Sequence, residues 1–172
     1  MRRTLVRIGH EIVEGNADRE VAIVGIHRRG AILATRLHQL VSDLLDEDLP
    51  LGDIDIAFYR DDFATRPQHP VVHASHLDFA IAQRTVVVVD DVLYTGRTVR
   101  AAIEALFDYG RPQRVQLAVL ADRGHRELPI RPDYVGKNLP TGRDERIQVE
   151  LVEIDERDGV FLIGEPEDAD DV

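Results

Sequence analysis

The amino-acid sequence predicts an α/β fold built on a mainly parallel twisted sheet flanked by helices. Short continuous apolar runs, typical of strands covered on both faces, alternate along the chain with longer segments whose apolar residues recur at helical spacing. Strands that alternate with helices form parallel sheets, because each helix carries the chain back over a face of the sheet. The chain has 172 residues, which fits one domain with a substantial core.

Hydrophobic periodicity places the elements of the first half of the chain. Apolar residues at helical spacing predict helices, and continuous or alternating apolar runs predict strands. These patterns predict a helix over 4–14, a strand over 21–24, a loop over 25–30, a helix over 31–45 and a strand over 54–58. The first helix should end at Gly15-Asn16, because both residues favour helix termination.

The second half of the chain continues the alternation. It predicts a strand over 85–89, a helix over 98–108, a strand over 115–120 and a possible strand over 147–151. Four consecutive valines make the first of these the strongest strand of the chain. The helix should stop at Gly110, with Pro112 beyond it.

Residues 60–82 show no sustained period and hold two prolines. A connection this long inside a compact domain is usually functional or disordered. Its three histidines, His69, His73 and His76, raise the question of a metal site. Their irregular spacing, without a fixed carboxylate partner, favours solvated loop residues instead.

Composition excludes several classes of protein. The chain has no cysteine, so disulfides and thiolate metal sites are excluded. No apolar run approaches the roughly 20 residues that span a bilayer. His10, Glu11 and Glu14 interrupt any signal-peptide core. A cytoplasmic protein with no membrane partner is expected.

The net charge of −11 argues at first against a nucleic-acid partner, but the charge is unevenly distributed. Residues 153–172 carry nine acids and one base, a net of −8, whereas residues 1–36 carry seven arginines against four acids, a net of +3. A local basic face is therefore compatible with an acidic chain. Residues 156–172 are expected to form a solvated acidic tail.

The segment from Asp90 to Thr98 carries the strongest chemical signal. Two aspartates follow the 85–89 strand, and Thr95-Gly96-Arg97-Thr98 leads into the next helix. Ligands bind at the carboxyl ends of strands in open α/β sheets, and a helix N-terminus offers unpaired N–H groups to an anion. Gly96 lets the backbone approach closely, and the threonines add hydroxyl donors. This part of the segment is typical of a phosphate site.

The two aspartates need a different partner, because carboxylates repel phosphate. At about 4 Å, two like charges repel by roughly 4 kcal/mol at an effective dielectric of 20. Ribose hydroxyls, bound directly or through hydrated Mg²⁺, remove this conflict, so the implied ligand is a sugar phosphate. A Walker loop is excluded because no Gly-Lys-Ser/Thr is present, and no G-x-G-x-x-G follows the first strand. An Asp-Asp turn that only caps the helix is the remaining alternative.

The stretch from Val89 to Thr98 resembles the signature of type I phosphoribosyltransferases. A closer resemblance, to the family of bifunctional pyrimidine operon attenuation proteins and uracil phosphoribosyltransferases, covers Leu5 to about Leu151. The further motifs that carry it are Gly25-Ile26-x-x-Arg29-Gly30, Tyr59-Arg60-Asp61-Asp62, Asp108-x-Gly110-Arg111-Pro112, Asp122 to Arg131 and Tyr134 to Asn138. The last two motifs are specific to this family within the fold.

The resemblance implies a type I phosphoribosyltransferase fold and an organisation of the chain. A single domain over 1–155 would hold a flexible flap over 61–82 and a small hood over about 122–145. The loop of residues 25–30 would bind pyrophosphate, and in this fold it often holds a non-proline cis peptide. The resemblance also implies a homodimer or a higher homo-oligomer.

The implied reaction transfers phosphoribosyl from phosphoribosyl pyrophosphate (PRPP) to uracil, giving UMP and pyrophosphate. The residues implied to bind PRPP are Arg28, Arg29, Gly30, Asp90, Asp91, Val92, Leu93, Tyr94, Thr95, Gly96, Arg97 and Thr98. The catalytic residues would be Asp90, Asp91 and Arg60. The cofactor is Mg²⁺, carried by the substrate, with Asp90 and Asp91 as its possible protein ligands. A purine or orotate phosphoribosyltransferase is the alternative, which the Arg-Gly-His-Arg-Glu hood sequence disfavours.

The resemblance implies a second activity, regulation of pyrimidine biosynthetic genes. The protein would bind the leader mRNA of these genes when UMP or UTP is abundant. The candidate RNA-binding residues are Arg7, His10, His125, Arg126, Arg131 and Lys137. For Arg7 and His10 alone, a solvated helix face is the alternative.

Overall fold

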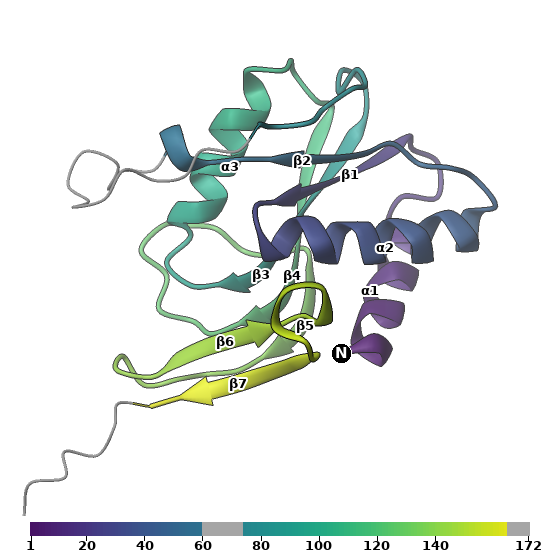
Figure 1. Cartoon of the computed structure of the whole chain (residues 1–172). Helices are drawn as coiled ribbons and strands as arrows, with labels where there is room; N and C mark the ends of the chain where they lie inside the picture. The colour runs from purple at the N-terminus through teal and green to yellow at the C-terminus, as the bar shows by residue number, and fades with distance from the viewer. Residues whose placement is uncertain (60–73, 165–172) are drawn as a thin grey trace, which may run out of the picture.

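A five-stranded sheet in the order β2-β1-β3-β4-β5 forms the centre of the protein (Figure 1). The computed structural model describes residues 1–59 and 74–164. The strands are β1 (Val21–Ile26), β2 (Leu51–Ile54), β3 (Thr85–Leu93), β4 (Arg114–Asp122) and β5 (Tyr134–Asn138). All neighbouring strands of this sheet are parallel, which confirms the predicted fold class.

Helices cover both faces of the sheet. The helices α1 (Arg2–Gly15) and α2 (Arg29–Leu45) pack on one face, and α3 (Arg97–Phe107) packs on the other. Val87 and Val89 of β3 join the core beneath α1 and α2, whereas Val86 and Val88 join the core beneath α3. Successive side chains of a strand point to opposite faces, so the run of valines serves both cores. Among the described residues, no helix is long and apolar enough to cross a membrane.

The strand predicted over 54–58 is wrong in position. β2 ends at Ile54, and η1 (Ala57–Tyr59) is a 3-10 turn. The carboxylate of Asp55 accepts the N–H of Ala57 at 2.8 Å, which turns the chain away from the sheet. Phe58 is consequently 65% exposed, and its alternation with the preceding isoleucines does not mark a strand.

The edge strand β5 is missing from the predicted elements. It lies inside the segment assigned to the hood, but it pairs in parallel with β4, with Ala118 opposite Tyr134. Residues 134–138 therefore belong to the main sheet and not to a separate hood. The strand is short and contains Gly136 and Lys137, residue types that weaken a strand signal.

A second, antiparallel sheet pairs β6 (Arg146–Glu150) with β7 (Gly159–Ile163), and the short helix α4 (Val152–Asp155) lies between them. β6 matches the possible strand predicted over 147–151. The expectation of a solvated tail from residue 156 is wrong as far as residue 163, because β7 pairs along the whole of β6. The remainder of the expected tail, residues 165–172, lies outside the described residues.

Acidic side chains attach this hairpin to α2. Arg36 donates from Nη2 to Oε2 of Glu153 at 2.5 Å and to Oδ1 of Asp158 at 2.8 Å. These hydrogen bonds raise the pKa of the Arg36 guanidinium and lower the pKa of both carboxyl groups. Part of the C-terminal negative charge thus neutralises the basic excess of the first 36 residues instead of projecting into solvent.

Candidate active site

The strand order brings the two loops with predicted anion-binding roles to one place. β1 and β3 are neighbours, paired from Val21–Thr85 to Gly25–Val89. The chain leaves β1 for α2 on one face and leaves β3 for α3 on the other. In open α/β sheets, ligands bind outside the carboxyl ends of strands at such a reversal. The loop after β1 and the segment 90–98 therefore line the same end of the sheet.

Asp90 and Asp91 lie within β3, which runs to Leu93 and not only to Val89 as predicted. Asp90 is only 6% exposed, and its Oδ1 accepts the N–H of Asp91 at 2.9 Å. The pKa of Asp90 is raised well above its usual range, mainly by burial and to a smaller extent by the negative charge of the Asp91 carboxylate. A buried carboxylate held at a strand end is typical of a ligand-binding group, because packing alone would not favour it.

The first turn of α2 packs directly on this strand end, because β1 runs to Ile26 and α2 begins at Arg29, which leaves only residues 27–28 of the loop predicted over 25–30. A methyl group added at Gly30 would lie 2.5 Å from the carbonyl oxygen of Val89 and 3.4 Å from Oδ1 of Asp90. Only glycine allows the backbone to come this close. The peptide bond between His27 and Arg28 is cis, as the resemblance implies.

Arg28 and Arg29 stand at the start of α2, with Arg28 as its N-cap. Nη2 of Arg29 donates to both oxygens of Asp155, at 2.9 and 3.1 Å. Oδ2 of Asp155 also accepts the N–H of Leu151. This hydrogen bond is the main reason that the pKa of Asp155 is lowered. The helix α4 therefore positions Arg29 beside the site, a role for Asp155 that the sequence did not indicate.

The segment 94–98 is held by the chain that follows β4. The carbonyl oxygen of Thr95 accepts the N–H groups of Glu127 and Leu128, at 3.0 and 3.1 Å. The guanidinium of Arg123 stacks 3.9 Å from the centre of the Tyr94 ring. Gly96, with φ of 94°, is the N-cap of α3, so this segment includes the start of that helix, where the first N–H groups have no helical partner.

Arg126 has an internal role in the same region. It donates from Nη1 to the carbonyl oxygen of Tyr94 at 2.7 Å and from Nε to that of Ile130 at 3.0 Å, and it pairs with Asp122. Its side chain is only 23% exposed. Arg126 therefore connects segment 94–98 to the loop 122–131, whatever further contact it makes.

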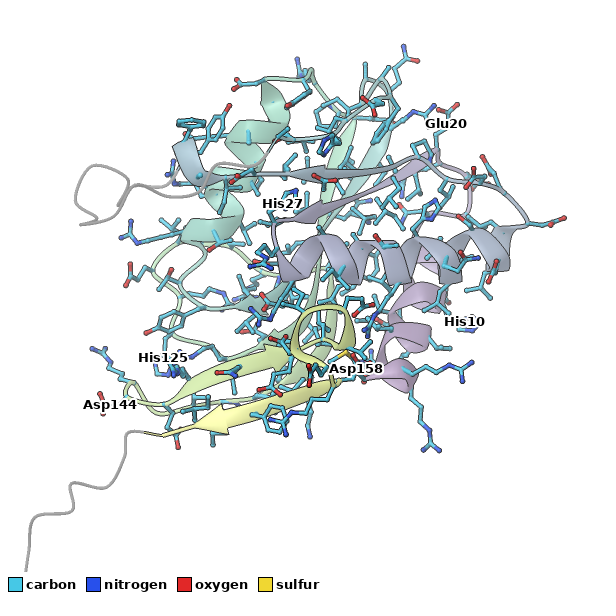
Figure 2. All side chains as sticks on the ribbon, in the orientation of Figure 1. His10, Glu20, His27, His125, Asp144 and Asp158 are labelled. Atoms are coloured by element: carbon cyan, nitrogen blue, oxygen red, sulfur yellow. The ribbon has the colours of Figure 1, made fainter. Side chains whose placement is uncertain are left out.

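The other candidate RNA-binding residues divide into two groups. Arg7 of α1 donates to the carbonyl oxygens of Val135 and Gly136, at 2.9 and 2.6 Å, which brings it next to Lys137. His125 contacts the carbonyl oxygen of Thr141 at 2.6 Å, in the loop region that also holds Arg131. Figure 2 shows His10 and His125 far apart, toward opposite sides of the molecule.

The predicted flap is described only in part. Arg60 and residues 61–73 lie outside the described residues. Residues 74–82, also assigned to the flap, pack against the sheet, with Ile81 1% exposed and His76 bridged to Asp53. At the other end, the hydroxyl of Tyr59 donates to Asp108, which raises the pKa of Tyr59.

Comparison with known proteins agrees with this geometry. The family model of the phosphoribosyl transferase domain matches residues 6–157. The chain belongs to the phosphoribosyltransferase family. Among its relatives are proteins named bifunctional protein PyrR. The one from Roseiflexus sp. strain RS-1 is 59% identical, with 95% of this chain and 90% of the relative covered. The one from Deinococcus radiodurans is 54% identical, with 98% of this chain and 92% of the relative covered.

Solved phosphoribosyltransferases share the fold. A purine phosphoribosyltransferase from Pyrococcus horikoshii is 29% identical and has a TM-score of 0.58, with 78% of each chain covered. A hypoxanthine-guanine phosphoribosyltransferase from Bacillus anthracis is 18% identical and has a TM-score of 0.64, with 80% of this chain and 78% of that chain covered. The type I phosphoribosyltransferase fold is therefore confirmed, and this phosphoribosyltransferase is also a relative of the bifunctional PyrR proteins.

Proposed function

We propose that the protein transfers phosphoribosyl from PRPP to uracil, giving UMP and pyrophosphate, and that it also binds leader mRNA of pyrimidine biosynthetic genes. The observation that carries the enzymatic part is the buried Asp90 beside Asp91 at the end of β3, between Gly30 and the start of α3. Relatives that are 50–59% identical and bear the name bifunctional protein PyrR support both activities. We place the reaction in the cytoplasm, in a homodimer or higher homo-oligomer.

In this proposal the chain binds and orients PRPP, and the chemistry needs few side chains. The bond between C1 of ribose and the pyrophosphate oxygen breaks, a bond from C1 to N1 of uracil forms, and the proton of N1 is released. Asp90 and Asp91 accept hydrogen bonds from the ribose hydroxyls, while residues 95–98 hold the 5′-phosphate. Arg28 and Arg29, at the N-terminus of α2, stabilise the negative charge that develops on the departing pyrophosphate.

The same two aspartates fit Mg²⁺, because carboxylate oxygens are the protein ligands that this ion prefers. Burial opposes the ionisation of Asp90. A nearby cation would therefore favour the charged form of this carboxyl group. When bound, Mg²⁺ would neutralise the negative charge of the departing pyrophosphate.

Purified protein is expected to form UMP from uracil and PRPP only when a divalent cation is present. The measurement is steady-state turnover with uracil, hypoxanthine, xanthine and orotate, each with Mg²⁺ and with EDTA. A purine base is the alternative substrate, suggested by the 29% identity to the Pyrococcus horikoshii enzyme. Equal or faster turnover of hypoxanthine or xanthine would overturn the uracil assignment and leave the transferase reaction intact.

The RNA-binding part of the proposal is supported by the exposed basic residues around β5. Within the described part of the chain, Arg131 and Lys137 are exposed and make no hydrogen bond or ion pair. A pocket of about 680 Å³ opens beside them, and its lining includes Arg126, Arg131, Pro132 and Asn138. Cationic side chains without internal partners can bind phosphates at lower cost than those already paired.

RNA affinity is expected to fall as salt increases, with a slope that depends on Arg131 and Lys137. Each phosphate contact removed should reduce the slope of log K against log salt by about one unit or slightly less. The measurement is a filter-binding titration of the gene's own leader RNA, with and without UMP, for wild type, Arg131→Ala and Lys137→Ala. Arg19→Ala is the matched control, since Arg19 is exposed in the turn before β1.

Binding no tighter than that of a scrambled hairpin, or unchanged slopes in both variants, would overturn the RNA-binding role. Arg126→Ala is a poor test of the same idea. Loss of the Arg126 guanidinium would leave the carbonyl oxygens of Tyr94 and Ile130 without this donor. It would therefore also disturb segment 94–98, which is proposed to bind PRPP.

A further inference from the structure

We propose that His27, Asp53 and His76 form a binding site for a divalent cation of the zinc class, made of different residues from the Mg²⁺ site at Asp90 and Asp91. One ligand atom from each of the three residues lies within 4.8 Å of the others. Within residues 1–59 and 74–164, this is the only group of three or more metal-ligating side chains with such spacing.

The carboxylate of Asp53 lies between the two imidazoles. Its Oδ1 is 2.5 Å from Nε2 of His27 and 3.2 Å from Nδ1 of His76. The side chains of His27 and Asp53 are 21% and 28% exposed, and that of His76 is 62% exposed. His27 and Asp53 are therefore mostly covered by the protein, and the group is open to solvent on the side of His76.

The backbone fixes these three positions. The N–H of His27 donates to the carbonyl oxygen of Ile54 at 3.0 Å, which extends the pairing of β1 with β2. Asp53 and His76 exchange two backbone hydrogen bonds, of 3.0 and 2.9 Å. Because the supporting contacts are made by the main chain, substitution of the side chains leaves the framework in place.

The donor set indicates which cation binds. Two imidazole nitrogens and one carboxylate oxygen, with a position open to water, are typical of zinc sites, and imidazole also suits nickel and copper. Mg²⁺ prefers oxygen ligands, so it should compete poorly. In tetrahedral zinc sites, bonds of about 2.0–2.2 Å separate the donor atoms by roughly 3.3–3.6 Å. Small side-chain rotations would bring the three donors to that spacing.

A neighbouring cavity supplies room and a further oxygen. A pocket of about 280 Å³ is lined by Asp53, His76 and Asp78 together with residues from the first two turns of α2. Asp78 lines the same pocket, so a carboxylate is available there to accept a hydrogen bond from a metal-bound water. A hydrogen-bonded His-Asp-His cluster without a metal is the alternative, and the experiment below separates the two.

The position of the site suggests a regulatory role, a suggestion that rests on the proposed function. His27, which is labelled in Figure 2, ends the pairing with β2. It directly precedes Arg28 and Arg29, which are proposed to hold pyrophosphate. A cation bound to His27 would fix the start of this loop. Coupling between two sites in one protein is typically about 5- to 150-fold in affinity, so zinc is expected to change PRPP affinity at least about fivefold.

The test uses the full chain after EDTA treatment, titrated with Zn²⁺ by calorimetry and with Co²⁺ by visible absorption, both in excess Mg²⁺ and without PRPP. One equivalent of each ion should bind to wild type. Loss of an outer-shell partner weakens metal affinity about 10- to 100-fold, so His76→Gln and Asp53→Asn should weaken it by at least about 100-fold. His10→Gln, on the exposed face of α1, is the control and should bind as wild type does.

Absence of a bound equivalent in excess Mg²⁺, or equal affinity in wild type, His76→Gln and Asp53→Asn, would overturn the site. Thermal melting curves establish that the variants are folded, and His76→Gln retains both backbone hydrogen bonds to Asp53. The titrations need neither PRPP nor uracil, so their outcome is independent of the enzymatic assignment. PRPP affinity that is equal with and without Zn²⁺ would overturn the regulatory role.

Discussion

Asp90→Asn is expected to lose transfer activity by at least about 100-fold while melting at a higher temperature than wild type at pH 7. The activity falls because the amide no longer supplies a charged acceptor for ribose hydroxyls or Mg²⁺, and loss of one such electrostatic contact typically costs about 100- to 1,000-fold. The stability rises because the amide has no charge to bury, and its oxygen can still accept the N–H of Asp91.

The sign of the stability change follows from the direction of the pKa shift. Burial raises the pKa of Asp90, so the folded protein holds this proton more tightly than the unfolded chain, whose aspartates titrate near about 3.9. The free energy of unfolding therefore decreases as pH rises from the unfolded pKa through the folded one. The gain in melting temperature from Asp90→Asn should be largest above the folded pKa and should disappear in acid.

Thermal melts over a pH series, combined with turnover at neutral pH, measure both effects. Asp43→Asn, a matched change on the exposed part of α2, should leave melting temperature and turnover unchanged. A fall in the melting temperature of Asp90→Asn, with full activity per folded molecule, would show that Asp90 is a structural residue that only caps the strand end.

Gly30→Ala is expected to destabilise the protein by about 3 kcal/mol and to abolish PRPP binding. The added methyl group would lie 2.5 Å from the carbonyl oxygen of Val89 and 3.2 Å from Cα of Asp90, both backbone atoms that cannot rotate away. Overpacking of this kind typically costs about 1–3 kcal/mol, and about 1 kcal/mol shifts the melting temperature of a chain of this size by roughly 2–4 °C. The first turn of α2 and β3 can separate only by displacing Asp90.

Thermal unfolding and PRPP binding by calorimetry measure the two effects. Gly164→Ala is the control, because a methyl group there meets no atom within 4 Å. Wild-type stability and PRPP affinity in Gly30→Ala would mean that the site does not require the close approach of the first turn of α2 to β3.

The parts of the fold that follow from local sequence were predictable. The valines of β3 are apolar on both faces, and Asp90-Asp91 followed by Thr95-Gly96 has few alternative explanations. The limits of β3 were not predictable in the same way, because residues 90–93 are in the strand only through their pairing with β4, as in Val92 opposite Ala121. Polar residues extend a strand when a neighbour supplies the hydrogen bonds.

Features that depend on contacts between distant residues left weaker signals. β7 contains the short apolar run Val160-Phe161-Leu162-Ile163, but acidic residues on either side favoured a tail. Its place is fixed by pairing with β6 and by the contacts of Asp158. The carboxylate partner of His76 was likewise not foreseeable, since Asp53 meets it only because the chain bridges back to β2 after residue 73. No fixed spacing in the sequence marks either contact.

The pairing of β1 with β3 also governs the order in which the chain can assemble on the ribosome. Val21 pairs with Thr85, so one edge of β1 has no partner until residues 85–93 have been synthesised. Until then, α1, β1, α2 and β2 present an apolar strand edge, which is the kind of surface that associates with other chains. Nascent chains that stall before residue 85 should therefore recruit chaperones, and two separately expressed halves divided at that point should recover activity only when they are made together.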